Sequence, residues 1–117
     1  MSERTYLDFL QDIAYCLAKA QSFIAGMTFE EFLTDEKTHF AVVRALEIVG
    51  EATKRLPPEL KSRYPALPWR EMAGMRDKLV HDYFGVNLQV VWETALDEAP
   101  VLEAAMLPLL ANEIPQR

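Results

Sequence analysis

The chain has 117 residues, 50% of them hydrophobic and 26% charged, with a formal net charge of −6, which excludes a disordered chain and fits one compact domain over residues 1–117. The acidity argues against a broad phosphate-binding surface, because such surfaces depend on clustered lysine and arginine, so any RNA site must be local. No apolar stretch approaches the roughly 18 residues that a membrane-spanning helix needs, and the N-terminus lacks a signal-peptide pattern, so we expect a cytoplasmic protein that binds no membrane.

Apolar residues in the first half of the chain recur at the three- and four-residue steps of amphipathic helices. They predict a first helix over about 3–25, stopped near Gly26. The sequence TFEE, residues 28–31, has the spacing of a capping box and predicts one short turn of helix. A second long helix is expected over about 35–56, where a pair of prolines forbids continuation.

The second half of the chain predicts two more helices. Residues 57–68 are rich in proline and are interpreted as a connector, and Pro68 suits the first position of a third helix over about 68–84. A fourth helix should begin after Asn87, a good N-cap. Its apolar stripe keeps phase through Pro100, which favours one kinked helix over two separate ones.

Four or five helices with short joints predict an all-α, up-and-down bundle. The sequence shows no alternating β-branched runs and no Asn-Gly or Asp-Gly hairpin turns. It also lacks internal repeats and low-complexity tracts. We therefore expect no β-sheet.

The expected third helix carries the first residue suited to chemistry. At about 100° per residue its apolar side chains fill one continuous arc, and Arg76 falls in the middle of that arc. A buried, unpaired guanidinium costs several kcal/mol, so this position predicts a partner or a ligand. Two interpretations stay open: a structural salt bridge to a carboxylate of the second helix, such as Glu47 or Glu51, or a role in binding an anion.

His81 lies about 140° around the same helix from Arg76, so on a regular helix the two side chains would not point at one atom. Either the helix loosens before Gly85, or a second copy of the chain brings its own pair alongside. We favour the dimer, because it would also gather enough positive charge to hold a phosphate. Asp77, four residues before His81, could orient the imidazole and raise its basicity, although such pairs are often only surface contacts.

The spacing patterns typical of metal and cofactor sites are missing from the sequence. The other histidine, His39, has no His or Cys at ligand spacing, and the single cysteine, Cys16, is expected to pack in the core. A glycine-rich phosphate loop and a serine nucleophile motif are also absent. We therefore expect no metal and no cofactor, and chemistry carried by Arg, His, Asp and Tyr.

The segment RDKLVHDY, residues 76–83, resembles the Arg-x4-6-His signature of HEPN domains, and specifically the Arg-x4-His-x-Tyr form of the HepT-like ribonuclease toxins. Two further stretches look like other well-marked parts of that family: ALEIVGEA, residues 45–52, and PWREMAGMR, residues 68–76. The likeness spans nearly the whole chain and includes the spacing between these blocks.

This resemblance implies a single HEPN helical bundle that forms a homodimer with its paired motifs facing each other in a cleft. It implies a metal-independent RNA endonuclease, the toxin of a type II/VII-like toxin–antitoxin system. Arg76 would hold and neutralise the scissile phosphate, His81 would move the proton of the attacking 2′-hydroxyl or of the leaving oxygen, and Asp77 would orient the site.

The same resemblance implies a protein partner. Family members are encoded with a minimal nucleotidyltransferase antitoxin, which attaches AMP to the motif tyrosine, here Tyr83. An anionic adduct at that position would crowd the cleft and repel RNA. The alternative role of Tyr83 is that of a packed core aromatic, and one tyrosine can both pack and expose its hydroxyl.

Two alternatives come from other functional classes. The first is a non-catalytic HEPN module whose Arg76 and His81 cleft only binds a nucleotide or docks the nucleotidyltransferase partner. The second is a purely structural dimerising bundle. The motif disfavours the second, because a structural protein has no use for an arginine inside an apolar arc beside an Asp–His pair.

Overall fold

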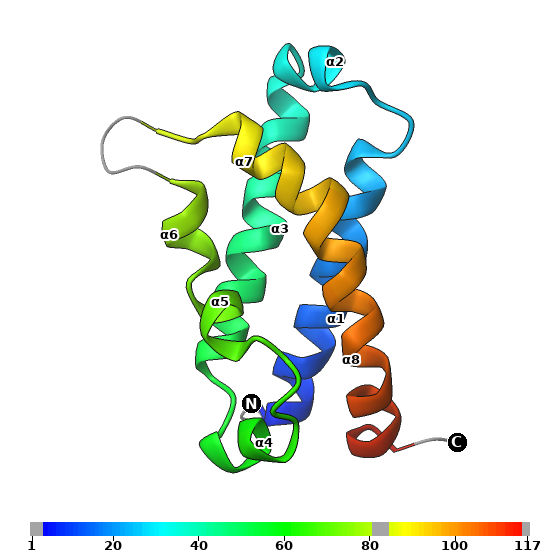
Figure 1. The fold of residues 1–117 in the computed structure, drawn as a ribbon, viewed down its shortest axis with the longest axis vertical. Helices are drawn as coiled ribbons and strands as arrows, with labels where there is room; N and C mark the ends of the chain where they lie inside the picture. Colours follow the sequence, from blue (N-terminus) through cyan, green and yellow to red (C-terminus); the bar gives the residue numbers. More distant parts are fainter. Residues whose placement is uncertain (1–3, 81–84, 116–117) are drawn as a thin grey trace.

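The computed structural model describes residues 4–80 and 85–115, and within them it confirms the predicted all-α bundle. Figure 1 shows the long helices running along the bundle, with α2 at one end and α4 at the other. The long helices are α1 (Tyr6–Ile24), α3 (Glu36–Lys54) and the run α7 (Leu88–Glu93), η2 (Thr94–Glu98) and α8 (Ala99–Glu113). The short helices are α2 (Phe29–Leu33), α4 (Pro58–Arg63), α5 (Trp69–Ala73) and α6 (Met75–Leu79). No helix in the described ranges is long and apolar enough to span a bilayer.

The core lies where the apolar faces of α1, α3 and α8 meet. Side chains at the predicted helical spacing are fully buried, and each contributes about 1.5–3 kcal/mol by leaving water. Cys16 is buried among them, as predicted. The central members of this core are Leu10, Ile13, Leu17, Val42, Leu46, Val49, Met106 and Leu109.

Three predicted helix boundaries are confirmed by their capping contacts. The Thr28 hydroxyl accepts from the Glu31 backbone N–H at 3.1 Å, while the Thr28 N–H donates to the Glu31 carboxylate at 2.9 Å. The Asn87 side chain accepts from the Val90 N–H at 3.1 Å. Gly26, with φ +78°, follows α1 in the left-handed region that a glycine adopts without strain. These contacts satisfy backbone groups that helix ends leave unpaired.

The last helical run continues through Pro100 and does not separate into two helices, as predicted. It does so through one π-helical turn, Thr94–Glu98, placed just before the proline. The buried Thr94 hydroxyl donates to the Val90 carbonyl at 2.6 Å within this stretch. A wider turn is a known way to absorb a proline inside a continuous helix.

The connector 57–68 is more ordered than the sequence suggested. It contains α4, whose first residue, Pro58, needs no hydrogen bond there. The indole N–H of Trp69 then donates to two carbonyls of this segment, at 3.1 Å to Lys61 and 3.0 Å to Tyr64. These two bonds fix the position of the proline-rich stretch relative to Trp69, the first residue of α5.

The prediction that residues 68–84 form a single continuous helix, the third of the bundle, is wrong. The chain forms α5 and α6 with Gly74 between them, and Val80 is extended, with φ −119° and ψ 127°. Val80 pairs with Val86 in an isolated antiparallel bridge. A β-branched residue such as valine favours an extended backbone over a helical one. The helix therefore ends at Leu79.

Close contact with α3 also sets the position of α5 and α6. At Gly50 of α3, an added Cβ would lie 3.3 Å from the Met72 carbonyl oxygen, 3.3 Å from the Met75 Cβ and 3.4 Å from the Ala73 carbonyl oxygen. Ordinary Cβ contacts are longer than this, so a larger residue must push the elements apart. Gly50 thus allows α5 and α6 to pack directly on the backbone of α3.

At the end of the bundle where α4 lies, one carboxylate joins the last helix to two other elements. Glu113 of α8 accepts from the Tyr64 hydroxyl at 2.7 Å, from Arg63 at 3.0 Å and from the Tyr6 hydroxyl at 3.4 Å. The hydrogen bond from Tyr64, followed by the bond from Arg63, lowers the pKa of Glu113 below its ordinary value. This carboxylate therefore ties α8 to α4 and to the start of α1.

We predict that Gly50→Val lowers the free energy of unfolding by about 1–3 kcal/mol, because the added methyl groups overpack the contact with Met72 and Met75. Urea denaturation measures the change. Lys54→Val is the matched control, since it places the same residue at an exposed position of the same helix. Equal losses in the two variants would contradict the close-packing argument.

We predict that Glu113→Gln lowers the melting temperature by a few degrees at pH 7. Because the pKa of Glu113 is lowered in the fold, its stabilisation is present above the ordinary carboxyl pKa and is lost as the pH falls through the lowered value. The variant should therefore show a flatter decline of melting temperature in acid. Glu59→Gln, at an exposed position of α4, should keep the wild-type acid profile.

Candidate functional site

The candidate site is built on α6, a helix of five residues. Met75 and Leu79 are buried against the core, whereas Arg76, Asp77 and Lys78 are exposed. Because the two apolar residues are four apart, they anchor one face of the helix and leave the other face to solvent. The buried pair thus fixes which way the charged residues point.

Arg76 does not lie inside an apolar arc, contrary to the prediction. Its side chain is 59% exposed, because the break at Gly74 and the end of α6 at Leu79 remove the continuous helix that defined the arc. Of the two carboxylates named as examples of a structural partner, Glu47 and Glu51, the structure pairs Arg76 with Glu47 of α3. The Arg76 Nε lies 3.3 Å from the Glu47 Oε2. Within the described residues, Glu47 is the one carboxylate within ion-pair distance of Arg76.

The Arg76–Glu47 contact leaves the guanidinium able to bind an anion. Arginine has five N–H donors, and this contact uses the Nε edge. An ion pair this exposed contributes about 0–1 kcal/mol, so a phosphate can share or replace the carboxylate. The structural and the anion-binding interpretations of Arg76 are therefore compatible.

Two backbone contacts close the chain just beyond α6. Besides the bridge between Val80 and Val86, the Asn87 N–H donates to the Leu79 carbonyl at 2.9 Å. Gly85, with φ +85°, supplies the left-handed turn before this closure. The chain therefore enters and leaves the segment 81–84 at neighbouring points, directly beside the end of α6.

A second ion pair holds α6 from its other side. Lys78 pairs with Glu98, the last residue of the π-helical turn. Helical periodicity contains no direct signal for this pair, because the two residues are 20 positions apart. It links the site helix to the last long helix, as Glu47 links it to α3.

The two remaining sequence predictions on this segment, His81 and Tyr83, lie outside the described residues. The predicted orientation of His81 relative to Arg76 and Asp77 assumed a regular helix, and that helix ends at Leu79. Two explanations were offered for the 140° separation: a helix that loosens before Gly85, or a second copy of the chain. The helix ends at Leu79, before Gly85, and the second copy stays a prediction. Asp77 is exposed on α6, next to Arg76 in the chain.

Among residues 4–80 and 85–115, no group of three or more His, Cys, Asp or Glu side chains is arranged to hold a metal ion. His39, the second histidine, instead hydrogen-bonds through its Nε2 to the Phe32 carbonyl and packs on the Phe32 ring, with centroids 4.9 Å apart. Its role in the described structure is to join α2 to α3.

The comparison with protein families settles the relationship of this chain. The family described as ribonuclease HepT-like matches residues 13–108, which include α6 and the segment that follows it. The chain belongs to the HepT-like family. The motif that begins at Arg76 is therefore in its family context, and the resemblance seen in the sequence is confirmed.

Relatives of this HepT-like chain agree over almost its full length. A protein of Thermococcus cleftensis named "Probable ribonuclease HepT" is 50% identical over 101 residues, covering 86% of this chain and 92% of the relative. A protein of Caldanaerobacter subterraneus named "Putative RNase" is 44% identical over 111 residues, covering 94% and 96%. Another of that name in Methanocaldococcus jannaschii is 43% identical over 100 residues, covering 86% and 83%. No solved structure matches the chain.

We predict that Arg76→Gln and Glu47→Gln each change the free energy of unfolding by less than about 1 kcal/mol, because the Arg76 side chain is 59% exposed and water screens the pair. Thermal and urea denaturation measure the change. A loss of several kcal/mol in either variant would mean that the pair is a structural element and would argue against a free role for the guanidinium.

Proposed function

We propose that this HepT-like protein is a metal-independent RNA endonuclease that acts in the cytoplasm as the toxin of a toxin–antitoxin pair. One observation carries the proposal: Arg76 stands exposed on a firmly packed helix, five residues before His81, in a chain whose relatives are named as ribonucleases. A guanidinium can stabilise the charge that develops on the phosphate and an imidazole can move a proton, and cleavage of RNA by its own 2′-hydroxyl uses both kinds of help.

In the proposed reaction the ribose 2′-oxygen attacks the adjacent phosphorus. The bond from the 2′-oxygen to phosphorus forms, the bond from phosphorus to the 5′-oxygen breaks, and the products are a 2′,3′-cyclic phosphate and a 5′-hydroxyl. Arg76 neutralises the charge that develops on the phosphate oxygens. His81 accepts the proton of the 2′-hydroxyl or donates one to the 5′-oxygen, because an imidazole can serve as either base or acid in such a reaction.

The rigid surroundings of Arg76 support this role. Met75 and Leu79 anchor α6 in the core, while Glu47 and Glu98 hold its charged side chains from two directions. The guanidinium is thereby oriented before a phosphate arrives, which lowers the entropic cost of binding. Asp77, exposed on the same helix, is placed to orient the site.

We propose that the active form is a homodimer in which two copies of the motif share one cleft. A single Arg76 is partly neutralised by Glu47, and the chain carries a net charge of −6. Two copies would bring two guanidinium groups and two imidazoles to one phosphate. This arrangement would explain how an acidic protein holds RNA, because it gathers positive charge at one small site.

The proposed partner is a minimal nucleotidyltransferase antitoxin that attaches AMP to Tyr83. Tyr83 is two residues after His81 in the chain, so an adduct on it would bring a negative charge next to the proposed base. That charge would repel the RNA backbone and compete for Arg76. Modification would therefore switch off cleavage without unfolding the bundle.

We predict that the purified protein cuts single-stranded RNA in the presence of a chelator, and that His81→Ala and Arg76→Ala each slow cleavage by at least about 100-fold. Expression without the partner should arrest growth, and both variants should relieve the arrest. Arg70→Ala, an exposed arginine on α5, is the matched control and should cleave like wild type.

The alternative is a non-catalytic module that binds a nucleotide or docks the partner. Intact RNA after incubation with wild-type protein and with His81→Ala alike, combined with tight binding of a nucleotide or of the nucleotidyltransferase, would establish that alternative and overturn the proposed activity.

A further inference from the structure

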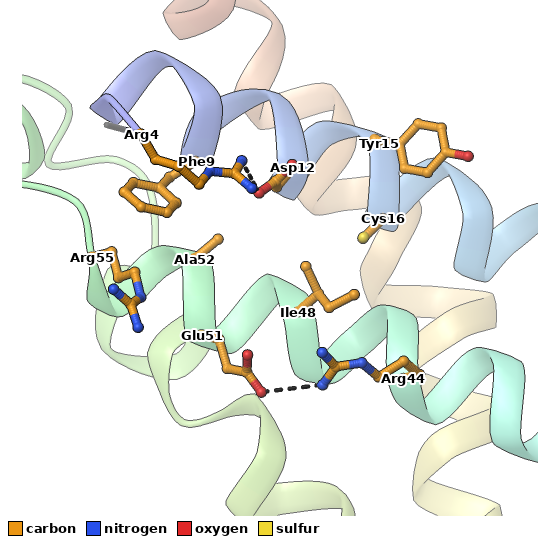
Figure 2. A pocket seen from close by; sticks show the side chains of 10 residues that line it. All are labelled: Arg4, Phe9, Asp12, Tyr15, Cys16, Arg44, Ile48, Glu51, Ala52 and Arg55. Carbon is orange, nitrogen blue, oxygen red and sulfur yellow. Dashed lines mark hydrogen bonds and ion pairs between the residues drawn. The ribbon is translucent and has the colours of Figure 1, made fainter. Parts of the chain in front are cut away.

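A second positively charged feature lies on the other flank of α3. A groove of about 1080 Å³ runs between α1 and α3, and Figure 2 shows the side chains that line it. Three of its lining residues are arginines: Arg4, Arg44 and Arg55. Because the whole chain has a net charge of −6, three guanidinium groups in one groove are a marked local exception.

Aromatic rings accompany the arginines in this groove. The Arg4 Cζ lies 5.2 Å from the centroid of the Phe9 ring, and the Arg55 Cζ lies 5.9 Å from the same centroid. In Figure 2 the Phe9 ring lies between these two side chains. Tyr15, 63% exposed, stands at the other end of the groove. Guanidinium planes and aromatic rings are the surfaces on which unpaired bases stack.

Two carboxylates in the groove partly balance its arginines. Arg4 pairs with Asp12 at 2.6 Å and Arg44 pairs with Glu51 at 3.3 Å. Both arginine side chains are more than half exposed, so each pair contributes about 0–1 kcal/mol and can yield to a phosphate. Within residues 4–80 and 85–115, no carboxylate lies at ion-pair distance from Arg55.

The buried thiol at the floor of the groove adds no negative charge. Cys16 is 7% exposed, and its burial, followed by the nearby charge of Asp12, raises the pKa of the thiol above its ordinary value. The groove therefore keeps a net positive charge from three arginines against two carboxylates.

The groove and the candidate site both use residues on one face of α3. Arg44 and Glu51, which line the groove, are three and four residues from Glu47, the partner of Arg76. Residues at those spacings lie on one helix face. An RNA strand held at Arg76 would therefore reach the groove by crossing α3, a helix about 10 Å wide.

We propose that the groove between α1 and α3 binds the backbone of single-stranded RNA next to the cut phosphate, with Arg4, Arg44 and Arg55 on phosphates and the exposed ring of Tyr15 beneath a base. This inference rests on the proposed function and adds to it a binding surface for several nucleotides of the strand next to the cut phosphate. Arg4, Phe9 and Arg55 lie at one end of the groove, and Tyr15 and Arg44 lie at the other. A single strand along the groove would therefore meet guanidinium groups and a ring at both ends.

The first test measures binding of a 2′-O-methyl single strand of about 12 nucleotides, which has no free 2′-hydroxyl to attack. In the Arg44→Gln/Arg55→Gln variant, fluorescence anisotropy should show affinity at least about ten-fold weaker and a salt dependence shallower by about 1.4, or about 0.7 per lost phosphate contact. Arg70→Gln removes an exposed arginine outside the groove and should change neither. Wild-type affinity in the double variant, or equal loss in the control, would overturn the proposal.

The second test separates this inference from the nuclease activity. Wild type should show a KM that falls as RNA lengthens from a trinucleotide to about 12 nucleotides, and the groove variant should lose this dependence on length. If Arg76→Ala abolishes cleavage while the groove variant keeps the wild-type length dependence, the groove proposal fails and the nuclease stands. If Arg76→Ala cleaves like wild type, the proposed nuclease site fails instead.

A protein occupant is the competing outcome. If a polyglutamate peptide binds wild type but not the groove variant, while the two bind the 2′-O-methyl strand equally, the groove takes an acidic protein segment and the RNA proposal is overturned. Circular dichroism and melting temperature of the variant check its fold. Arg44 and Arg55 are exposed, so little change is expected.

Discussion

At Gly50 the backbone of α3 comes within van der Waals contact of α5 and α6, with no room for a side chain between them. This contact sets the depth at which α6 lies in the bundle. With Met75 and Leu79 buried there, the opposite face of α6 must look outward, and Arg76 stands beside Glu47. A shift of a few tenths of an ångström at Gly50 would move the guanidinium as well, because α6 has only five residues to absorb it.

The charges of this protein act locally and not through a general field. The chain is acidic overall, yet its arginines gather on either flank of α3: Arg76 by α6, and Arg4, Arg44 and Arg55 in the groove by α1. Arg4, Arg44 and Arg76 each pair with a carboxylate, and their own side chains are more than half exposed. Such pairs orient a guanidinium at little energetic cost and release it easily to a phosphate. An acidic surface elsewhere would then limit unspecific binding of nucleic acid.

The stability of the molecule and the position of its site depend on different parts of the bundle. Packing of α1, α3 and α8 buries the core, and Glu113 joins these helices to α4 at the far end. The site elements α5 and α6 are short and depend on tertiary contacts, since helices of five residues are not stable alone. This separation lets Arg76 and Asp77 be exposed without weakening the core.

Much of the candidate site could be read from residue types, because the motif from Arg76 to Tyr83 and its neighbouring blocks identify the family without a structure. Glu47 was also foreseeable as the partner of Arg76, since it is one of few carboxylates at the right place on the second helix. The groove arginines could not be grouped in this way. Arg4 lies 40 positions from Arg44, and only the packing of α1 on α3 brings the two together.

The sequence by itself determined the long helices, because apolar spacing and capping residues act within a few positions of the chain: the capping box at Thr28, the N-cap at Asn87 and the continuous stripe past Pro100 are all as predicted. Tertiary structure decided the break at Gly74, the extended conformation of Val80 and the exposure of Arg76. Each depends on a contact with a distant or non-helical partner, Gly50 or Val86, and helical periodicity contains no information about such contacts.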